Sequence, residues 1–121
     1  MLKGDFYTIV TMERLPGSIK ALIELNREHP IFEGHFPGNP VVPGVCMVQI
    51  VKEFMEEASG LPVRITESSG IKFLSVINPG KDNQINLAVN YSMIQNKYVT
   101  QASLFWEQII YFKFKGVLEA I

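Results

Sequence analysis

The chain has 121 residues, 47% of them hydrophobic, and a formal net charge of −1 at pH 7. This length fits one domain spanning 1–121, and the apolar content is sufficient for a core, which argues against disorder. The small net charge gives no general electrostatic reason to bind nucleic acid, although it leaves room for a local basic patch.

The N-terminus and the cysteine content bear on the compartment. Residues 1–5 lack the apolar core of a signal peptide. No apolar run approaches the length of about 18 residues that crosses a membrane. The single cysteine, Cys46, excludes an intramolecular disulfide, and its apolar neighbours predict that it is buried. We therefore expect a soluble, cytoplasmic protein without membrane contact.

The first predicted elements are two strands. Residues 18–25 alternate between apolar and polar side chains, which predicts a half-buried strand. Pro16-Gly17 predicts a turn before it, and we expect residues 6–12 to form its partner strand.

A stiff loop follows at residues 35–44, which read HFPGNPVVPG. Each of its three prolines fixes its own φ and pushes the preceding residue toward an extended conformation. Such a loop can hold the imidazole of His35 in one place, and an ordinary pKa near about 6.5 suits this side chain as a base. A lone loop histidine is more often bonded to backbone, and we interpret His29 as such a surface or packing residue. For His35 the motif favours chemistry.

One helix is predicted from about Pro43 to Ala58, because Pro43 suits a first turn and Ser59-Gly60 suits an end. Residues 45–51 are apolar on nearly every face except at Gln49, so other structure should wrap this part. Four polar positions of the helix share one stripe: they are Gln49, Lys52, Glu53 and Glu56.

Beyond residue 60 the pattern predicts strands. Residues 85–91 and 110–115 alternate, and residues 78–80 and 95–97 predict turns. One long buried helix among antiparallel strands predicts an α+β fold in which a sheet curls round the helix.

Two segments resemble the 3-hydroxyacyl-acyl-carrier-protein dehydratases of fatty acid synthesis. Residues 29–45, HPIFEGHFPGNPVVPGV, are similar to the family's signature, and residues 71–81 resemble its later strand and turn, with Lys81 where an acidic residue is usual. The resemblance implies the hotdog fold, a curled antiparallel sheet wrapped around one long central helix. It also implies a dimer with two active sites between subunits, and an acyl-carrier-protein thioester as substrate.

The implied reaction dehydrates a 3-hydroxyacyl thioester to a trans-2-enoyl thioester. His35 would take the proton next to the carbonyl. The backbone N–H groups near Gly44 and Val45, at the helix N-terminus, would stabilise the enolate-like oxygen. Gly44 would also let the substrate approach the backbone closely.

One departure from the family concerns the helix. The family usually carries a carboxylate fourteen residues after the histidine and a glutamine four residues later, whereas this chain has Gln49 and then Glu53. Gln49 can hydrogen-bond a hydroxyl but cannot donate a proton as a general acid. Glu53, about 6 Å further along the helix, either replaces the acid through a water or is a solvated residue paired with Lys52 or Lys97.

Other site types lack support in the sequence. Two histidines and one cysteine without HxxxH or CxxC spacing predict no metal site, and no phosphate loop or serine-nucleophile elbow occurs. We expect no cofactor. Two alternatives to a dehydratase stay open. The first is a non-catalytic acyl-binding subunit in a heterodimer with an active homologue, which Gln49 favours. The second is a hotdog thioesterase, against which the His-Phe-Pro motif argues.

Overall fold

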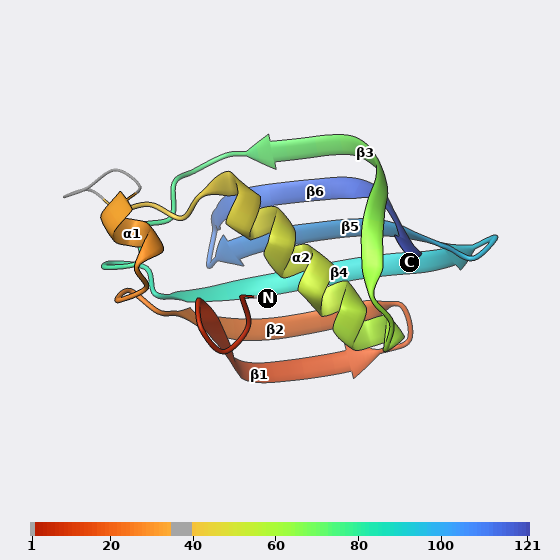
Figure 1. Cartoon of the computed structure of the whole chain (residues 1–121), viewed down its shortest axis with the longest axis horizontal. Coiled ribbons are helices and arrows are strands. Elements are labelled where there is room, and N and C mark those ends of the chain that lie inside the picture. Colours follow the sequence, from red (N-terminus) through yellow and green to blue (C-terminus); the bar gives the residue numbers. More distant parts are fainter. Residues whose placement is uncertain (1, 35–39) are drawn as a thin grey trace.

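The computed structural model describes residues 2–34 and 40–121, which form one antiparallel six-stranded sheet and two helices. Helix α2 lies across one face of this sheet (Figure 1). In chain order the elements are β1 (Tyr7–Leu15), β2 (Ser18–Leu25), α1 (Ile31–Gly34), α2 (Gly44–Ser59), β3 (Val63–Phe73), β4 (Gln84–Ile94), β5 (Lys97–Trp106) and β6 (Ile109–Ala120).

The strand order in the sheet is β1-β2-β4-β5-β6-β3, so β1 and β3 are its two edges. Strand β3 directly follows the helix in the chain but pairs with β6 at the edge opposite β1 (Figure 1). The predicted α+β layout, a curled sheet with one long helix, is confirmed. The sequence patterns located β2, β4 and β6, and they placed β1 within a few residues, but they did not delimit β3 or β5.

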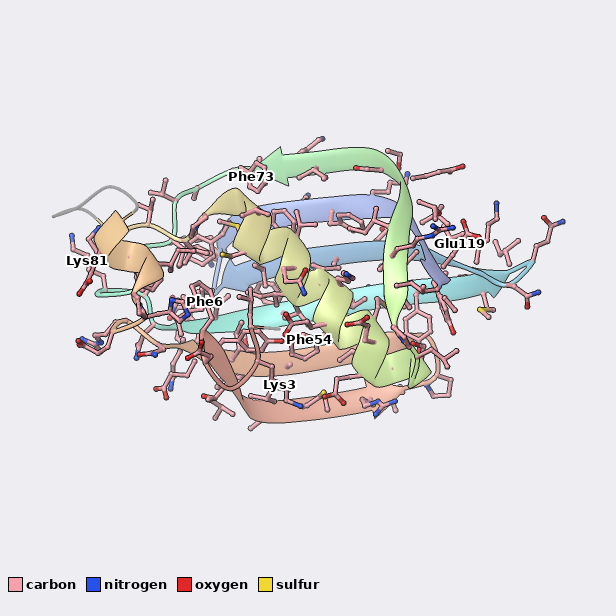
Figure 2. The ribbon with its side chains drawn as sticks, in the orientation of Figure 1. Lys3, Phe6, Phe54, Phe73, Lys81 and Glu119 are labelled. Carbon is pink, nitrogen blue, oxygen red and sulfur yellow. The ribbon has the colours of Figure 1, made fainter. Side chains whose placement is uncertain are left out.

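The core lies between α2 and the sheet. Alternate side chains of β2 are buried, as the pattern predicted, and Phe54 of α2 is 1% exposed. Figure 2 shows Phe54 on the helix and Phe6 near the start of β1, both inside the molecule. Burying a side chain of this size stabilises a fold by about 1.5–3 kcal/mol. The predicted burial of Cys46 is confirmed.

Helix α2 begins and ends within one residue of the prediction. Pro43 precedes it in an extended conformation, and Gly60 ends it with a left-handed φ of 71°. One expectation about its faces is wrong, because Val45 is 74% exposed rather than wrapped. Of the two alternatives left open for Glu53, the solvated one is wrong, because this residue is 3% exposed.

All three predicted turns are present, and at the first of them Gly17 has a φ of 78° between β1 and β2. The side-chain oxygen of Asn78 accepts a hydrogen bond from the N–H of Gly80 at 2.9 Å, and Gln95 and Asn96 have positive φ between β4 and β5. In the described part of the chain, no helix is long and apolar enough to cross a membrane.

Candidate active site at the N-terminus of helix α2

The segment leading into α2 is held by backbone hydrogen bonds. The N–H of Val42 donates to the carbonyl of Ile77 at 2.9 Å, which ties this segment to the connection between β3 and β4. The N–H groups of Cys46 and Met47 both donate to the carbonyl of Pro43, at 3.0 and 3.4 Å. The proline therefore closes the first turn of the helix, although it offers no side-chain cap.

The first two residues of the helix, Gly44 and Val45, also offer backbone N–H donors. Among residues 2–34 and 40–121, neither N–H has a hydrogen-bond acceptor. Unpaired N–H groups at a helix N-terminus carry the positive end of the helix dipole. This end of α2 can therefore bind an oxygen that gains negative charge.

A hollow of about 490 Å³ lies beside these donors. Most of its lining is apolar, which suits an acyl chain. The lining residues are Val41, Val42, Pro43, Gly44, Met47, Phe73, Leu74, Ser75 and Val76.

The ring of Phe73, at the end of β3, covers the start of the helix. A Cβ atom on Gly44 would lie 2.7 Å from Cζ of this ring, so only a glycine leaves the ring in place. Figure 2 shows Phe73 near the first turn of α2. The ring also packs against Phe112, with 5.4 Å between centroids, yet 55% of the Phe73 residue is exposed. A half-exposed ring can swing aside, which makes Phe73 a candidate gate that the sequence reasoning missed.

Gln49 and Glu53 are hydrogen-bonded to each other one turn apart. Nε2 of Gln49 donates to Oε2 of Glu53 at 2.9 Å. Because an ionised carboxylate only accepts hydrogen bonds, the amide nitrogen must face Glu53. The carbonyl oxygen of Gln49 is therefore left as the acceptor that this half-buried side chain can offer to a hydroxyl.

Glu53 has three further donors, all from the N-terminal part of the chain. Its carboxylate accepts hydrogen bonds from the N–H groups of Leu2 and Lys3, at 2.8 and 2.9 Å, and from the hydroxyl of Tyr7 at 3.1 Å. The alternative in which Glu53 is solvated and paired with a lysine side chain is wrong, because the carboxylate is enclosed by the segment that precedes β1. No sequence signal marks Tyr7 as a partner, since it lies 46 residues from Glu53.

These contacts determine the ionisation of Glu53. Burial by itself raises the pKa of this carboxyl, but the hydrogen bonds from Leu2, Gln49, Lys3 and Tyr7 outweigh burial and lower the pKa below its ordinary value. Burial and the neighbouring Glu53 raise the pKa of the Tyr7 hydroxyl. Glu53 is therefore a carboxylate, without a proton to donate, at neutral pH.

The two groups of candidate residues lie on different faces of α2. Gln49 follows Gly44 by five residues, which corresponds to about 140° of rotation and about 7.5 Å of rise. Accordingly, Gln49 is absent from the lining of the hollow beside Gly44. Within one chain, the structure brings Gly44 and Val45 together and Gln49 and Glu53 together, but it does not join the two pairs.

Of the two histidines, the structure describes only His29. The prediction for His35 lies outside the described residues. His29 packs edge-on against Phe6, with 5.4 Å between ring centroids, and its Nδ1 accepts a hydrogen bond from the N–H of Ile31. This packing agrees with the interpretation of His29 as a surface or packing residue.

A family model described as ApeI-like, ApeI dehydratase, matches residues 11–109. This chain belongs to the ApeI-like dehydratase family. Over 108 residues it is 30% identical to the 3-hydroxyacyl-[acyl-carrier-protein] dehydratase FabZ of Pediococcus pentosaceus, which covers 74% of this chain and 72% of that protein. The FabZ of Ligilactobacillus salivarius is 32% identical over 94 residues, and the match spans 64% of its length, slightly less than two thirds.

Solved structures of similar shape support the fold. A chain of the dehydratase heterocomplex ApeI:P from Xenorhabdus doucetiae superposes with a TM-score of 0.78 at 20% identity, covering 91% of this chain and 95% of that one. An uncharacterised protein from Erwinia carotovora gives a TM-score of 0.63 at 17% identity, covering 94% and 92%. The predicted hotdog fold and the resemblance to hotdog dehydratases are thus confirmed.

Proposed function

We propose that this ApeI-like dehydratase removes water from a 3-hydroxyacyl thioester carried on acyl carrier protein, giving a trans-2-enoyl thioester. The observation that carries this proposal is the pair of N–H groups at Gly44 and Val45, which have no acceptor among the described residues and lie beside an apolar hollow. Membership of the family supports it, as do the names of the curated relatives.

The proposed reaction begins at the carbon next to the thioester carbonyl. His35 takes a proton from this carbon, while the N–H groups of Gly44 and Val45 donate to the carbonyl oxygen as it becomes enolate-like. The bond to the hydroxyl then breaks, and the proton passes from His35 to the leaving oxygen, which departs as water. Gln49 holds this hydroxyl through its amide and does not itself supply the proton.

We propose that the complete site forms between two subunits. The different faces occupied by Gly44 and Gln49 support this arrangement, because one chain does not present both to the same hollow. Edge strand β3 and its continuation also leave large apolar side chains exposed beside the hollow. They are Ile71, Phe73, Leu74 and Val76.

The direct test is to incubate the pure protein with 3-hydroxyacyl and enoyl thioesters of acyl carrier protein and to follow their interconversion. The proposal expects equilibration from either side. Absence of turnover with a protein that is folded and dimeric contradicts it.

A second candidate is a non-catalytic acyl-binding subunit that pairs with an active homologue. Two observations favour it: Gln49 stands where the family usually has a carboxylate, and Glu53 is ionised and already accepts four hydrogen bonds. Co-expression with a related dehydratase chain separates the two candidates. If the chain is a non-catalytic subunit, we expect a stable heterodimer and no turnover by this chain alone.

A further inference from the structure

The sheet face opposite α2 carries two rows of side chains that cross four strands. The strand register aligns Ala88, Ser103, Lys113 and Lys72 in the first row, and Asn90, Gln101, Lys115 and Gly70 in the second. Lys113 and Lys115 of β6 are exposed, whereas Phe112 and Phe114, which alternate with them along the strand, are buried. The two rows therefore face away from the helix.

A shallow hollow of about 430 Å³ lies along these rows. Gly70 and Ala88, the smallest residues of the two rows, leave room for it at opposite ends. Ser69 also borders it and donates its hydroxyl to the backbone carbonyl of Lys115 at 3.2 Å. The hydroxyl of Ser103 and the amide of Gln101 add hydrogen-bond donors between the strands. We call this hollow and its eight-residue lining rows the basic groove.

The charges in the basic groove have one sign. Lys72 stands directly opposite Lys113, and like charges at opposed positions of a sheet destabilise it. Neither these two lysines nor Lys115 forms an ion pair with any of the described residues, and no carboxylate belongs to the two rows.

Lys20 provides an internal contrast. It extends the first row onto β2, where it stands opposite Ala88, but Glu13 of β1 occupies the next position in the same row. A carboxylate thus stands directly across the strands from this lysine, whereas neither row of the basic groove contains a carboxylate.

The dimensions of the basic groove favour a compact anion. Neighbouring strands lie about 4.8 Å apart, and two residues along a strand span about 6.8 Å, so the roots of the three lysines form a small triangle. Flexible lysine side chains can converge from such a triangle on one multiply charged group. Between Lys113 and Lys20 the first row holds only the uncharged Ser103 and Ala88, so the lysines do not form the continuous track that a nucleic-acid backbone needs.

We propose that the basic groove binds a phosphate-bearing small molecule, with a diphosphate group held by Lys72, Lys113 and Lys115. This site lies on the opposite face of the sheet from α2, and the proposal does not depend on the dehydratase reaction. It also gives a reason for the opposed lysines, because a bound polyanion turns their repulsion into attraction.

The test titrates inorganic pyrophosphate into the 15N-labelled protein and measures amide shifts by NMR and the dissociation constant by calorimetry. We expect shifts at residues 69–72, 101–103 and 113–115. The triple variant Lys72→Gln, Lys113→Gln, Lys115→Gln should bind at least about ten-fold more weakly. The control Lys20→Gln should change the affinity less than about two-fold, since Lys20 lies outside the basic groove and opposite Glu13.

Folding is checked in the same samples. The triple variant should melt at or above the temperature of the wild type, because it loses a repulsive pair. Pyrophosphate should raise the melting temperature of the wild type and not that of the triple variant.

Three outcomes overturn the proposal. The first is no binding at about 10 mM pyrophosphate, a concentration that would detect even very weak sites. The second is equal binding by the wild type and the triple variant. The third is tighter binding of hexaglutamate or of a thymidine oligonucleotide through the same lysines, which would assign the basic groove to an acidic protein or to nucleic acid instead.

Discussion

Glu53 holds the N-terminal segment against helix α2. Its carboxylate joins the backbone of Leu2 and Lys3 to the hydroxyl of Tyr7, so removing it leaves one buried and two part-buried donors without this acceptor. We expect Glu53→Ala to lower the free energy of unfolding by about 2–3 kcal/mol, measured by urea denaturation. The control is Glu57→Ala. Because the ion pair of Glu57 with Lys3 is exposed, that change should cost less than about 1 kcal/mol.

The carboxylate of Glu53 should also account for part of the stability that the folded protein loses in acid. The pKa of Glu53 is lower in the folded chain than its ordinary value. Its stabilising contribution is therefore complete above about pH 4.3, the value of an unfolded glutamate, and is lost as the pH falls through the lower folded pKa. Denaturation curves at several pH values should show a smaller loss of stability below about pH 4.3 for Glu53→Gln than for the wild type. Equal slopes for the two proteins would contradict this role.

Gln49 and Glu53 stand where the family usually has a carboxylate and a glutamine, and variants of the two residues should differ in turnover. If the chain lacks a general acid at Gln49, then Gln49→Glu should raise dehydratase turnover. An ionised Glu53 is engaged by four donors and has no proton to give, so Glu53→Gln should change turnover only through stability. Steady-state rates of both single variants and of the double variant test this, because residues that act on one step are non-additive. A sharp loss of turnover in a stable Glu53→Gln protein would instead make Glu53 the acid.

His35 is the proposed base. His35→Ala should reduce dehydratase turnover by about 10²–10⁴-fold, the usual contribution of a general base, and leave the circular dichroism spectrum unchanged. The matched control is His29→Ala, which alters the other histidine and its packing on Phe6 but should retain turnover per folded molecule. A folded His35→Ala variant with wild-type turnover would exclude this histidine as the base.

At the scale of the elements, the ring of Phe73 at the end of β3 lies against the start of α2, where the helix donors are. A methyl group on Gly44 would collide with the Phe73 ring at 2.7 Å, but this half-exposed ring can move away. We expect Gly44→Ala to cost less than about 1 kcal/mol in the free energy of unfolding and yet to lower turnover, because the methyl group crowds the donors.

Gly70→Ala is the control for this substitution, since a Cβ there meets only Lys115 at 4.0 Å. It should leave both stability and turnover near wild type. If Gly44→Ala behaves in the same way as this control, the helix N-terminus does not bind the substrate.

At the scale of the whole molecule, β3 is an unprotected edge with apolar side chains around it. Exposed apolar clusters on an edge of this kind usually mark an interface. We expect a homodimer in which strands of the two sheets meet, measured by light scattering at micromolar concentration. A monomer would contradict this expectation, and it would also leave the proposed two-subunit site incomplete.

Val76→Asp tests where the subunits meet. Val76 is 72% exposed in the single chain, so the substitution should shift the protein toward the monomer without unfolding it. Ile109→Asp introduces the same charge at a residue that is 51% exposed and lies at the turn between β5 and β6. This control should stay dimeric.

The sequence alone determined the elements whose signals are local. Alternation located β2, β4 and β6, and Pro43 and Gly60 marked the ends of α2, because side-chain period and turn chemistry act over a few residues. The signature at residues 29–45 indicated the family, which the comparisons confirmed. The role of His35 stays a prediction.

Tertiary structure decided which distant residues meet. The carboxylate of Glu53 lies 51 residues from Leu2, so the sequence left open whether this side chain replaces the acid or lies in solvent. Phe73 over Gly44 and Lys72 opposite Lys113 likewise depend on β3 pairing with β6 after the intervening strands have formed the sheet. Periodicity says which face a side chain occupies, but only the packing of the whole chain determines what lies across from it.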